Sequence, residues 1–279
     1  MARKQVERPE PGPRRNLNHI LRYATTTAAM LACAIAAIAA FHKTEAFLVE
    51  DARFALHPPN EDGEESPNIK LHGIGHAPRS RVAAVFDRDY GRSIYLLPLA
   101  ERRRQLLAVE WVKDASIRRT WPNRLDVYLS ERQPVAFLEV PSDQPGAARL
   151  ALIDDEGVVL EPPARAQYHL PVLAGVRRDQ GPPARRDGVR RMLRLLAEAA
   201  PWAEKISEID VGDPDNLKVT EQVDGRALIL LVGNRNFRQK LEKFHGYYPE
   251  IRGQLGDAVT LDLRIENRIV LVKGAGHAR

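Results

Sequence analysis

Hydrophobic residues near the start of the chain form one long uninterrupted run. From Tyr23 to Phe41 there are 19 residues without a formal charge, bounded by Arg22 and by His42-Lys43. As a helix this run would be about 28 Å long, which is close to the thickness of the hydrocarbon core of a membrane. The pattern predicts a transmembrane helix over residues 23–42.

The same run also fits a cleaved signal peptide, because Ala34-Ile35-Ala36 and Ala37-Ile38-Ala39 have the small-x-small pattern of a cleavage site. Its apolar core is longer than the usual about 7–15 residues, which favours a retained anchor. Residues 1–22 carry six basic and two acidic side chains. The positive-inside rule therefore predicts a cytoplasmic basic tail at 1–22 and an extracytoplasmic location for everything after the helix.

After the apolar run the pattern changes to short amphipathic segments. Residues 43–67 form a predicted spacer that ends in a loop with prolines and acidic side chains at 57–67. Periodicity then predicts a strand at Ile69–His72, a helix after Pro78, a helix at about 99–108, and strands at Ala115–Ile117 and Leu125–Leu129. The last two strands are predicted to form a hairpin whose corner is Trp121-Pro122-Asn123. The simplest interpretation of this corner is a packed indole, and a binding role is the alternative. This order predicts an α+β unit over residues 68–138.

The region 139–273 is richer in strands. A hairpin is predicted at 151–160 around the acidic turn Asp154-Asp155-Glu156-Gly157, and another around Asp224-Gly225. Helical spacing marks two helices, one from Val189 to Ala199 and one containing Phe237, Leu241 and Phe244. Alternating residues at 259–266 and the apolar stretch Ile269–Val272 close the pattern. We expect a mainly antiparallel β domain with flanking helices at 139–273 and a C-terminal tail at 274–279.

The net charge of +5 does not indicate a nucleic-acid-binding protein. The excess of four positive charges in residues 1–22 leaves only +1 for the rest of the chain, which is too little for phosphate binding. The runs Arg102-Arg103-Arg104, Arg118-Arg119 and Arg185-Arg186 are interpreted as solvated faces of helices and strands.

Candidate reactive groups do not assemble into a known catalytic pattern. His72 and His76 have ligand-like spacing, but the glycines between them indicate a loop with exposed histidines. The turn Asp154-Asp155-Glu156 lacks the longer pattern of a calcium loop. Gly73-Ile74-Gly75 lacks the third glycine of a dinucleotide site, and no Walker-type lysine is present. Since Cys33 is the one cysteine, an intrachain disulfide is impossible. The sequence predicts a protein that is not an enzyme and uses no cofactor or metal.

Several short sequence motifs follow the basic tail and the apolar helix, and they are spread over about 200 residues. They are Gly91-Arg92-Ser93-Ile94-Tyr95, Trp111-Val112-Lys113-Asp114-Ala115, Arg118-Arg119-Thr120-Trp121-Pro122-Asn123-Arg124-Leu125, Glu131-Arg132-Gln133-Pro134-Val135-Ala136, Leu152-Ile153-Asp154 with Gly157-Val158-Val159, Leu170-Pro171-Val172-Leu173, and Leu261-Asp262-Leu263-Arg264 with Asn267-Arg268-Ile269-Val270. In this order the chain resembles the FtsQ/DivIB family of bacterial cell-division proteins. It departs from the family at Val109-Glu110, where Leu-Pro is frequent, and at the acidic loop 57–67.

The resemblance implies a POTRA domain at 68–138 and an FtsQ-type β domain at 139–273. It also implies a non-enzymatic scaffold of the divisome, located in the inner membrane at the septum with its folded domains in the periplasm. Its partners would be division proteins of the FtsB and FtsL type. Two other functions stay open: a secreted or outer-membrane assembly factor with a POTRA domain and a cleaved signal peptide, and an envelope hydrolase of unfamiliar type.

The last strand is the candidate partner-binding site. A strand at a sheet edge leaves backbone N–H and C=O groups open for pairing with a strand of another protein. The resemblance implies that the contact consists of Arg264, Ile265, Ile269, Val270, Leu271, Val272 and Lys273, although the family often has an aromatic residue where this chain has Ile265. The alternative is an interior strand with Arg264 in an internal ion pair.

Overall fold

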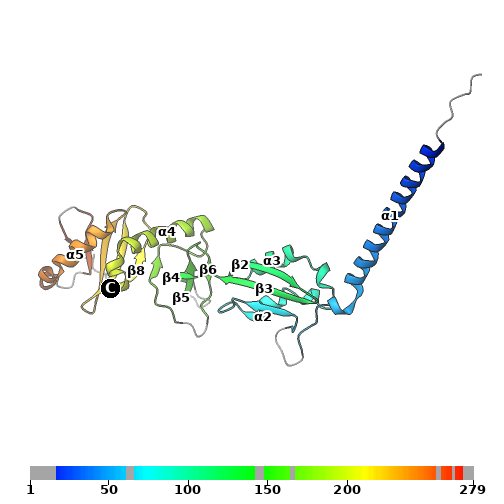
Figure 1. Ribbon diagram of the computed structural model, residues 1–279. Helices are drawn as coiled ribbons and strands as arrows, with labels where there is room; N and C mark the ends of the chain where they lie inside the picture. Colours follow the sequence, from blue (N-terminus) through cyan, green and yellow to red (C-terminus); the bar gives the residue numbers. More distant parts are fainter. Residues whose placement is uncertain are drawn as a thin grey trace, which may run out of the picture. The chain divides into compact units, whose positions relative to one another are not determined.

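The computed structural model describes residues 17–60, 66–141, 148–163, 167–255, 259–265 and 268–272. It contains two compact units (Figure 1). The first is formed by the chain up to His72 with Arg79–Leu106 and Ala115–Tyr128. The second is formed by Gly73–Pro78, Leu107–Asp114 and the chain from Leu129 onwards.

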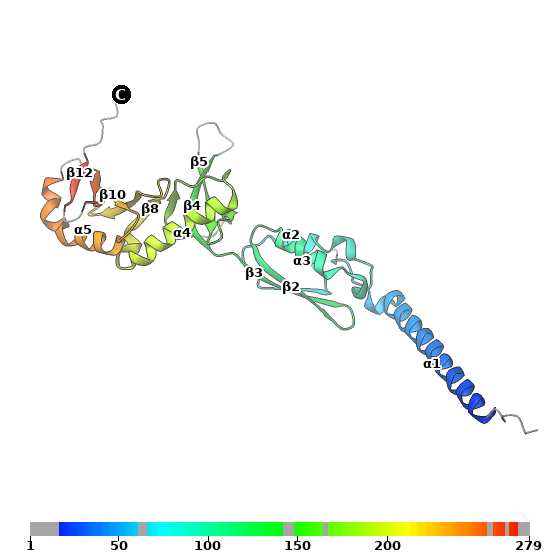
Figure 2. The ribbon, with the colours of Figure 1, turned by 90° about the horizontal axis from the view of Figure 1, so that it is seen from above.

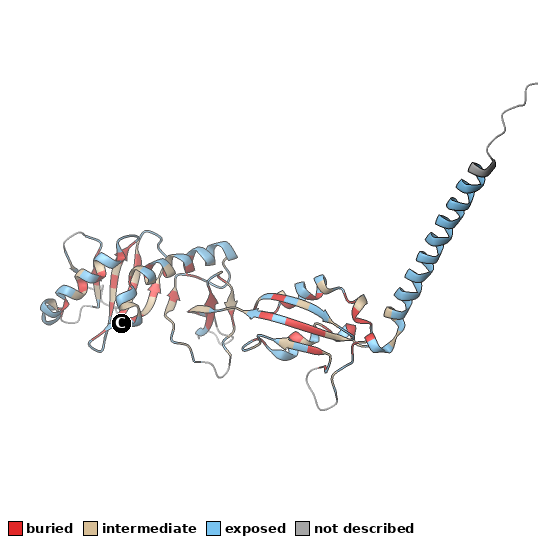
Figure 3. Cartoon of the chain, viewed as in Figure 1, coloured by how far each residue is buried: buried red, intermediate tan, exposed pale blue. Residues whose placement is uncertain are grey.

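The apolar segment forms α1, which runs from Leu17 to Glu50 and is exposed along almost all of its length (Figure 3). It is long and apolar enough to cross a membrane. The helix extends past the predicted residues 23–42 because no glycine or proline interrupts it before Glu50. Thr25, Thr26 and Thr27 donate their hydroxyls to carbonyls three or four residues earlier, which satisfies these polar groups within the helix itself.

The first folded region has the predicted order of strand, helix, helix, strand, strand. Its elements are η1 Ala52–Phe54, β1 Ile69–His72, α2 Arg79–Ala84, η2 Asp87–Asp89, η3 Ile94–Leu96, α3 Leu99–Leu107, β2 Val112–Thr120 and β3 Arg124–Glu131. The sheet order is β1-β3-β2, and β1 runs parallel to β3 with Ile69 opposite Leu125. Val82 of α2, Leu106 of α3 and Val127 of β3 are fully buried, so apolar side chains from both helices and the sheet form the core.

The interpretation of the arginine runs as solvated faces is wrong for Arg102. Its side chain is buried and makes a bidentate ion pair with the fully buried Asp89, with Nε 2.6 Å from Oδ2 and Nη2 2.8 Å from Oδ1. Arg119 stays exposed, as predicted, but its guanidinium donates to the carbonyls of Ile94 and Leu97. These guanidinium groups bind loops that have no regular hydrogen-bond ladder of their own.

The second region is a nine-stranded sheet with helices. Its elements are β4 Pro134–Pro141, β5 Ala148–Asp154, β6 Val159–Leu160, β7 Val172–Ala174, α4 Pro182–Glu198, η4 Ala200–Lys205, β8 Ile206–Asp210, β9 Leu217–Val223, β10 Arg226–Gly233, α5 Phe237–Ile251, η5 Arg252–Gln254, β11 Thr260–Asp262 and β12 Val270–Val272. The strand order is β12-β11-β10-β9-β8-β7-β4-β5-β6. Three of the eight pairings, β10–β11, β4–β7 and β7–β8, are parallel and the other five are antiparallel.

Helices α4 and α5 lie along one face of this sheet (Figure 2). Val189 and Met192 of α4 and Leu241 and Phe244 of α5 share one core with alternate strand residues such as Leu230. The opposite face keeps half-buried side chains. This one-sided covering is typical of a mainly antiparallel sheet, and it agrees with the predicted α+β class.

The loop after β1 is held by Glu131, the last residue of β3. Its carboxylate accepts hydrogen bonds from the backbone N–H groups of Gly75, His76 and Ala77 at 2.8–2.9 Å. Gly73 permits this turn, because its φ is +79° and a Cβ there would collide with the Leu129 carbonyl. Burial by itself raises the pKa of the Glu131 carboxyl, but the three N–H donors outweigh it and hold that pKa below its ordinary value.

A Glu131→Gln variant is therefore expected to lose about 1–2 kcal/mol of stability at neutral pH, because charge-assisted bonds become neutral ones. A carboxyl with a lowered folded pKa stabilises above its unfolded pKa of about 4.3, and that stability is lost as pH falls through the folded value. Urea unfolding at pH 7 and pH 3 should show the difference between variant and wild type shrinking in acid. Glu139→Gln, at an exposed position of β4, is the control, and a Glu131 effect no larger than this control would contradict the prediction.

Candidate functional site

The C-terminal edge of the nine-stranded sheet is formed by β11 and β12. The two strands pair antiparallel, with Leu261 opposite Leu271. In the part of the chain that the structure describes, β11 is the one sheet neighbour of β12, which ends the strand order. The three residues of β12 are each more than a third exposed. One side of β12 is thus uncovered among the described residues.

The hydrogen bonds to β10 fix which way the β11 backbone faces. The Leu263 N–H donates to the Leu231 carbonyl at 3.0 Å, and the Ile229 N–H donates to the Val259 carbonyl at 2.7 Å. Backbone groups of alternate residues face opposite sides of a strand. Residues 260 and 262 consequently turn their backbone groups away from β10 and toward β12.

The same alternation assigns the backbone of β12. Val272 lies opposite residue 260 and Val270 opposite residue 262, so these two valines use their N–H and C=O groups on β11. Leu271 lies between them. Its backbone N–H and C=O therefore point outward, toward the open margin of the sheet.

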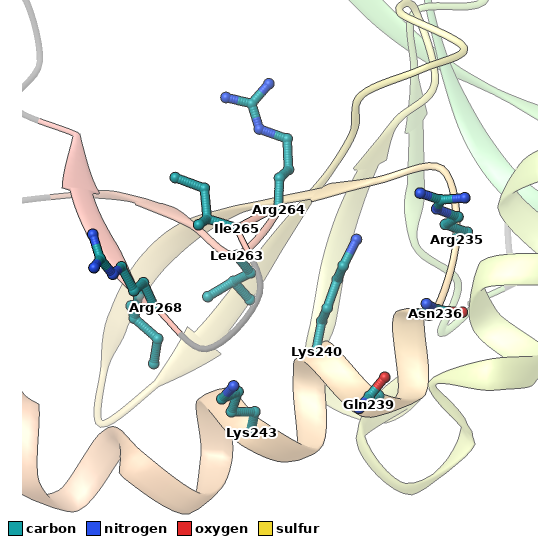
Figure 4. A pocket seen from close by; sticks show the side chains of 10 residues that line it. Arg235, Asn236, Gln239, Lys240, Lys243, Leu263, Arg264, Ile265 and Arg268 are labelled. Carbon is teal, nitrogen blue, oxygen red and sulfur yellow. The ribbon is translucent and has the colours of Figure 1, made fainter.

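A basic groove of about 300 Å³ lies beside this edge (Figure 4). The residues that line it are Arg235, Asn236, Gln239, Lys240, Lys243, Leu263, Arg264, Ile265, Arg268 and Ile269. Five of these ten are arginine or lysine and none is acidic. The groove thus combines positive charge with the apolar side chains of the segment between β11 and β12.

Helix α5 supplies the lysines of the groove. Its buried residues Phe237, Leu241 and Phe244 recur at helical spacing and fix the helix on the core. This leaves Lys240 and Lys243 on the flank that faces the groove (Figure 4). The Lys240 ammonium donates to the Val232 carbonyl at 2.7 Å, which holds its charge beside the end of β10.

Arg264 is oriented by Asp262, two residues earlier. Its Nε lies 2.9 Å from Oδ1 and its Nη2 lies 2.6 Å from Oδ2 of that carboxylate. The Arg264 guanidinium holds the pKa of Asp262 below its ordinary value, and Asp262 in turn raises the pKa of Arg264. The Arg264 side chain is still 45% exposed, so a local ion pair and an accessible guanidinium face coexist.

The structure brings most of the predicted contact residues together. Arg264, Ile265 and Ile269 line the groove, and Val270, Leu271 and Val272 form the edge strand. Lys273 lies outside the described residues. Sequence reasoning missed the contribution of α5 and of the two residues before it, Arg235 to Lys243, because no periodicity links a helix to a strand that follows it. The signal available was the polar flank of the helix at 237–251, with lysines at 240 and 243.

The other candidate sites have structural explanations. His72 stacks on Tyr128 with ring centroids 4.6 Å apart, and His76 packs against Trp111. In the acidic turn, Arg132 Nη1 lies 2.6 Å from Asp154 and 2.8 Å from Glu156. Among the described residues there is no group of three or more His, Cys, Asp or Glu that could hold a metal ion.

Two family models match the chain. Residues 67–132 match the POTRA domain of the FtsQ type, and residues 144–264 match the C-terminal region of cell division protein FtsQ/DivIB. The second match ends at Arg264, before β12.

Curated relatives carry the same name. The chain is 33% identical over 215 residues to the cell division protein FtsQ of Koribacter versatilis, covering 75% of this chain and 60% of that protein. It is 29% identical over 224 residues to that of Novosphingobium aromaticivorans, covering 78% and 64%, and 27% identical over 228 residues to that of Bradyrhizobium diazoefficiens, covering 80% and 60%. The matches thus span about three fifths of the length of these relatives.

Proposed function

The chain belongs to the FtsQ/DivIB family of cell-division proteins, and from that premise we propose that it is a non-enzymatic scaffold of the divisome. It recruits other division proteins through its folded extracytoplasmic regions. The observation that carries this proposal is the open margin of β12 beside a basic groove. Such an edge pairs with an extended segment of a partner, while side-chain contacts give selectivity.

The groove defines the chemistry of that segment. Among the described residues, five basic side chains and no acidic ones line it, so a partner strand with one or more carboxylates beside its apolar residues is the complementary ligand. Long-range attraction would speed the encounter, and the backbone pairing would hold the complex. The expected partners are division proteins of the FtsB and FtsL type.

Membrane anchoring by α1 complements this binding. The helix could span the hydrocarbon core once, with the basic N-terminal tail in the cytoplasm and both folded regions in the periplasm at the septum. Holding two proteins in one membrane raises their effective concentration, so a modest edge contact suffices. The rival arrangement has a cleaved signal peptide, and the mature N-terminus measured by mass spectrometry separates the two.

The test of the proposed function is purification of the full chain from membranes with identification of the proteins that come with it. We expect small single-pass division proteins in stoichiometric amounts. Co-purification of outer-membrane assembly proteins instead, or turnover of an envelope substrate by the purified chain, would overturn the proposal.

The groove charge can be tested separately. Arg268→Glu is expected to weaken partner binding about tenfold at low salt, mainly through slower association, because it reverses a charge on the wall of the groove. The difference from wild type should shrink as salt screens the interaction. Arg238→Glu makes the same charge change at an exposed α5 position outside the groove and serves as control. Equal effects of the two variants in biosensor measurements would show that only net charge matters.

A further inference from the structure

An aromatic cluster joins the end of α1 to the hairpin formed by β2 and β3. Phe54 is buried at its centre, with its ring centroid 5.4 Å from that of Phe47 in α1, 5.7 Å from that of Tyr95 and 4.9 Å from that of Trp121. Trp121 sits in the turn between the two strands. The hydrophobic core covers only part of this cluster.

The junction between α1 and the folded unit is also tied by hydrogen bonds. Ser93 donates its hydroxyl to the Leu48 carbonyl at 2.6 Å, and Leu56 donates its N–H to the Arg92 carbonyl at 2.9 Å. The Asp51 side chain caps η1 by accepting from the Arg53 N–H. The Ser93 bond connects the last turn of α1 directly to the loop before Tyr95, and the Leu56 bond connects the segment after η1 to the same loop.

Three large apolar side chains at this junction remain exposed. Trp121 is 65% exposed, so the prediction of a packed indole at the hairpin corner is wrong for most of its surface, and Phe47 and Leu96 are each 46% exposed. By contrast, the chain's other two tryptophans are better covered, since Trp111 is 3% exposed and Trp202 stacks on His245 at 5.0 Å. An exposed indole supported by packed rings marks an interaction surface.

The position of the cluster along α1 indicates what covers it. Phe47 follows the end of the uncharged run, Phe41, by six residues, or about 9 Å of helix. The headgroup layer extends about 5–8 Å beyond the hydrocarbon core on each side. Helical side chains lean toward the N-terminus, so the Phe47 ring reaches back into that layer. Tryptophan and tyrosine are enriched at this depth, because their rings are apolar with one polar atom.

We infer that Trp121, with Phe47 and Leu96, docks in the lipid headgroup layer of the membrane that α1 crosses, and so holds the first folded unit against the membrane surface. This inference rests on the proposed membrane anchoring. The occupant of the surface is lipid at the boundary between headgroups and acyl chains, and the indole N–H of Trp121 bonds to lipid carbonyl or phosphate oxygens.

Quenching by brominated lipids tests this inference on the full chain reconstituted in vesicles of phosphatidylcholine and phosphatidylglycerol. Bromine near the headgroup end of the acyl chains should remove up to about a third of the emission, because one of the three tryptophans is within reach. Trp121→Phe should abolish this quenching, whereas Trp202→Phe should retain it. Equal quenching in wild type and Trp121→Phe, or none in wild type, would overturn the inference.

Flotation of the same vesicles distinguishes a failure of the membrane anchoring from a failure of the docking of the aromatic cluster. A chain that does not float with the vesicles refutes the membrane anchoring itself. A chain that floats but shows no Trp121-dependent quenching refutes only the docking of the aromatic cluster. If Trp121→Phe impairs folding, acrylamide quenching of the wild type gives a second readout, because docked Trp121 should be less accessible in vesicles than in detergent.

Discussion

Asp89→Ala is expected to destabilise the first folded unit by about 3–5 kcal/mol, enough to unfold a small domain or leave it marginal. Asp89 is fully buried, and the Arg102 side chain that it binds is only 7% exposed. Removing the carboxylate deprives the buried guanidinium of its buried bidentate partner and leaves only the half-exposed Glu101 carboxylate, 3.4 Å from Nη1, as a counter-charge. Urea unfolding of the full chain in detergent should show an earlier transition for this unit.

Two further variants make the explanation specific. Asp87→Ala removes an exposed carboxylate from the same short helix and should change stability by less than about 0.5 kcal/mol. The paired replacement Asp89→Leu with Arg102→Met removes both charges and should recover most of the loss, since a buried ion pair is often replaceable by apolar groups. If Asp89→Ala were as mild as Asp87→Ala, the buried pair would contribute little.

Arg102 also shows a limit of sequence reasoning. Three consecutive arginines on a helix predict a solvated face. Nothing in the local pattern distinguishes Arg102, which is buried, from the two arginines that follow it. Burial of Arg102 depends on Asp89, thirteen residues earlier, which enters the core through a 3-10 turn. A partner at that separation has no periodic signal.

Hairpins were predictable because their turns have local signatures. Asp224-Gly225 between β9 and β10 adopts positive φ at both positions, as the residue types indicate. Strand β8, by contrast, has no signature of period two. Ile206 and Ile209 are both buried although they are three residues apart, because the pairing with β9 shifts register between Ile206 and Glu208.

The order of strands could not be predicted from alternation either. The parallel pairings of β7 with β8 and of β10 with β11 depend on connections through α4 and α5, whereas β4 and β7 pair in parallel across the intervening strands β5 and β6. Alternation shows which face of a strand is buried, but it does not show which strands lie beside it in the sheet. The groove beside β12 follows from these connections, since α5 lies between β10 and β11 in the chain and supplies one wall.

Leu271→Pro is expected to weaken partner binding by about 10- to 100-fold while the sheet stays intact. The outward N–H of Leu271 would be a donor to an added strand, and its loss leaves a partner carbonyl unpaired, at a cost of about 1–3 kcal/mol. The ring also obstructs close approach. Proline is tolerated at an edge position whose N–H faces away from the sheet, so the bonds of Val270 and Val272 to β11 should persist.

Two matched variants distinguish the contribution of the β12 backbone to partner binding from that of its side chains. Leu271→Ala keeps the N–H and should retain most of the affinity, whereas Val270→Pro removes a bond to β11 and should detach β12 altogether, which limited proteolysis would detect. Binding measured with the same membrane partner decides between mechanisms. If Leu271→Ala were the damaging change and Leu271→Pro the mild one, the partner would dock on the side chain of β12, and pairing with its backbone would be excluded.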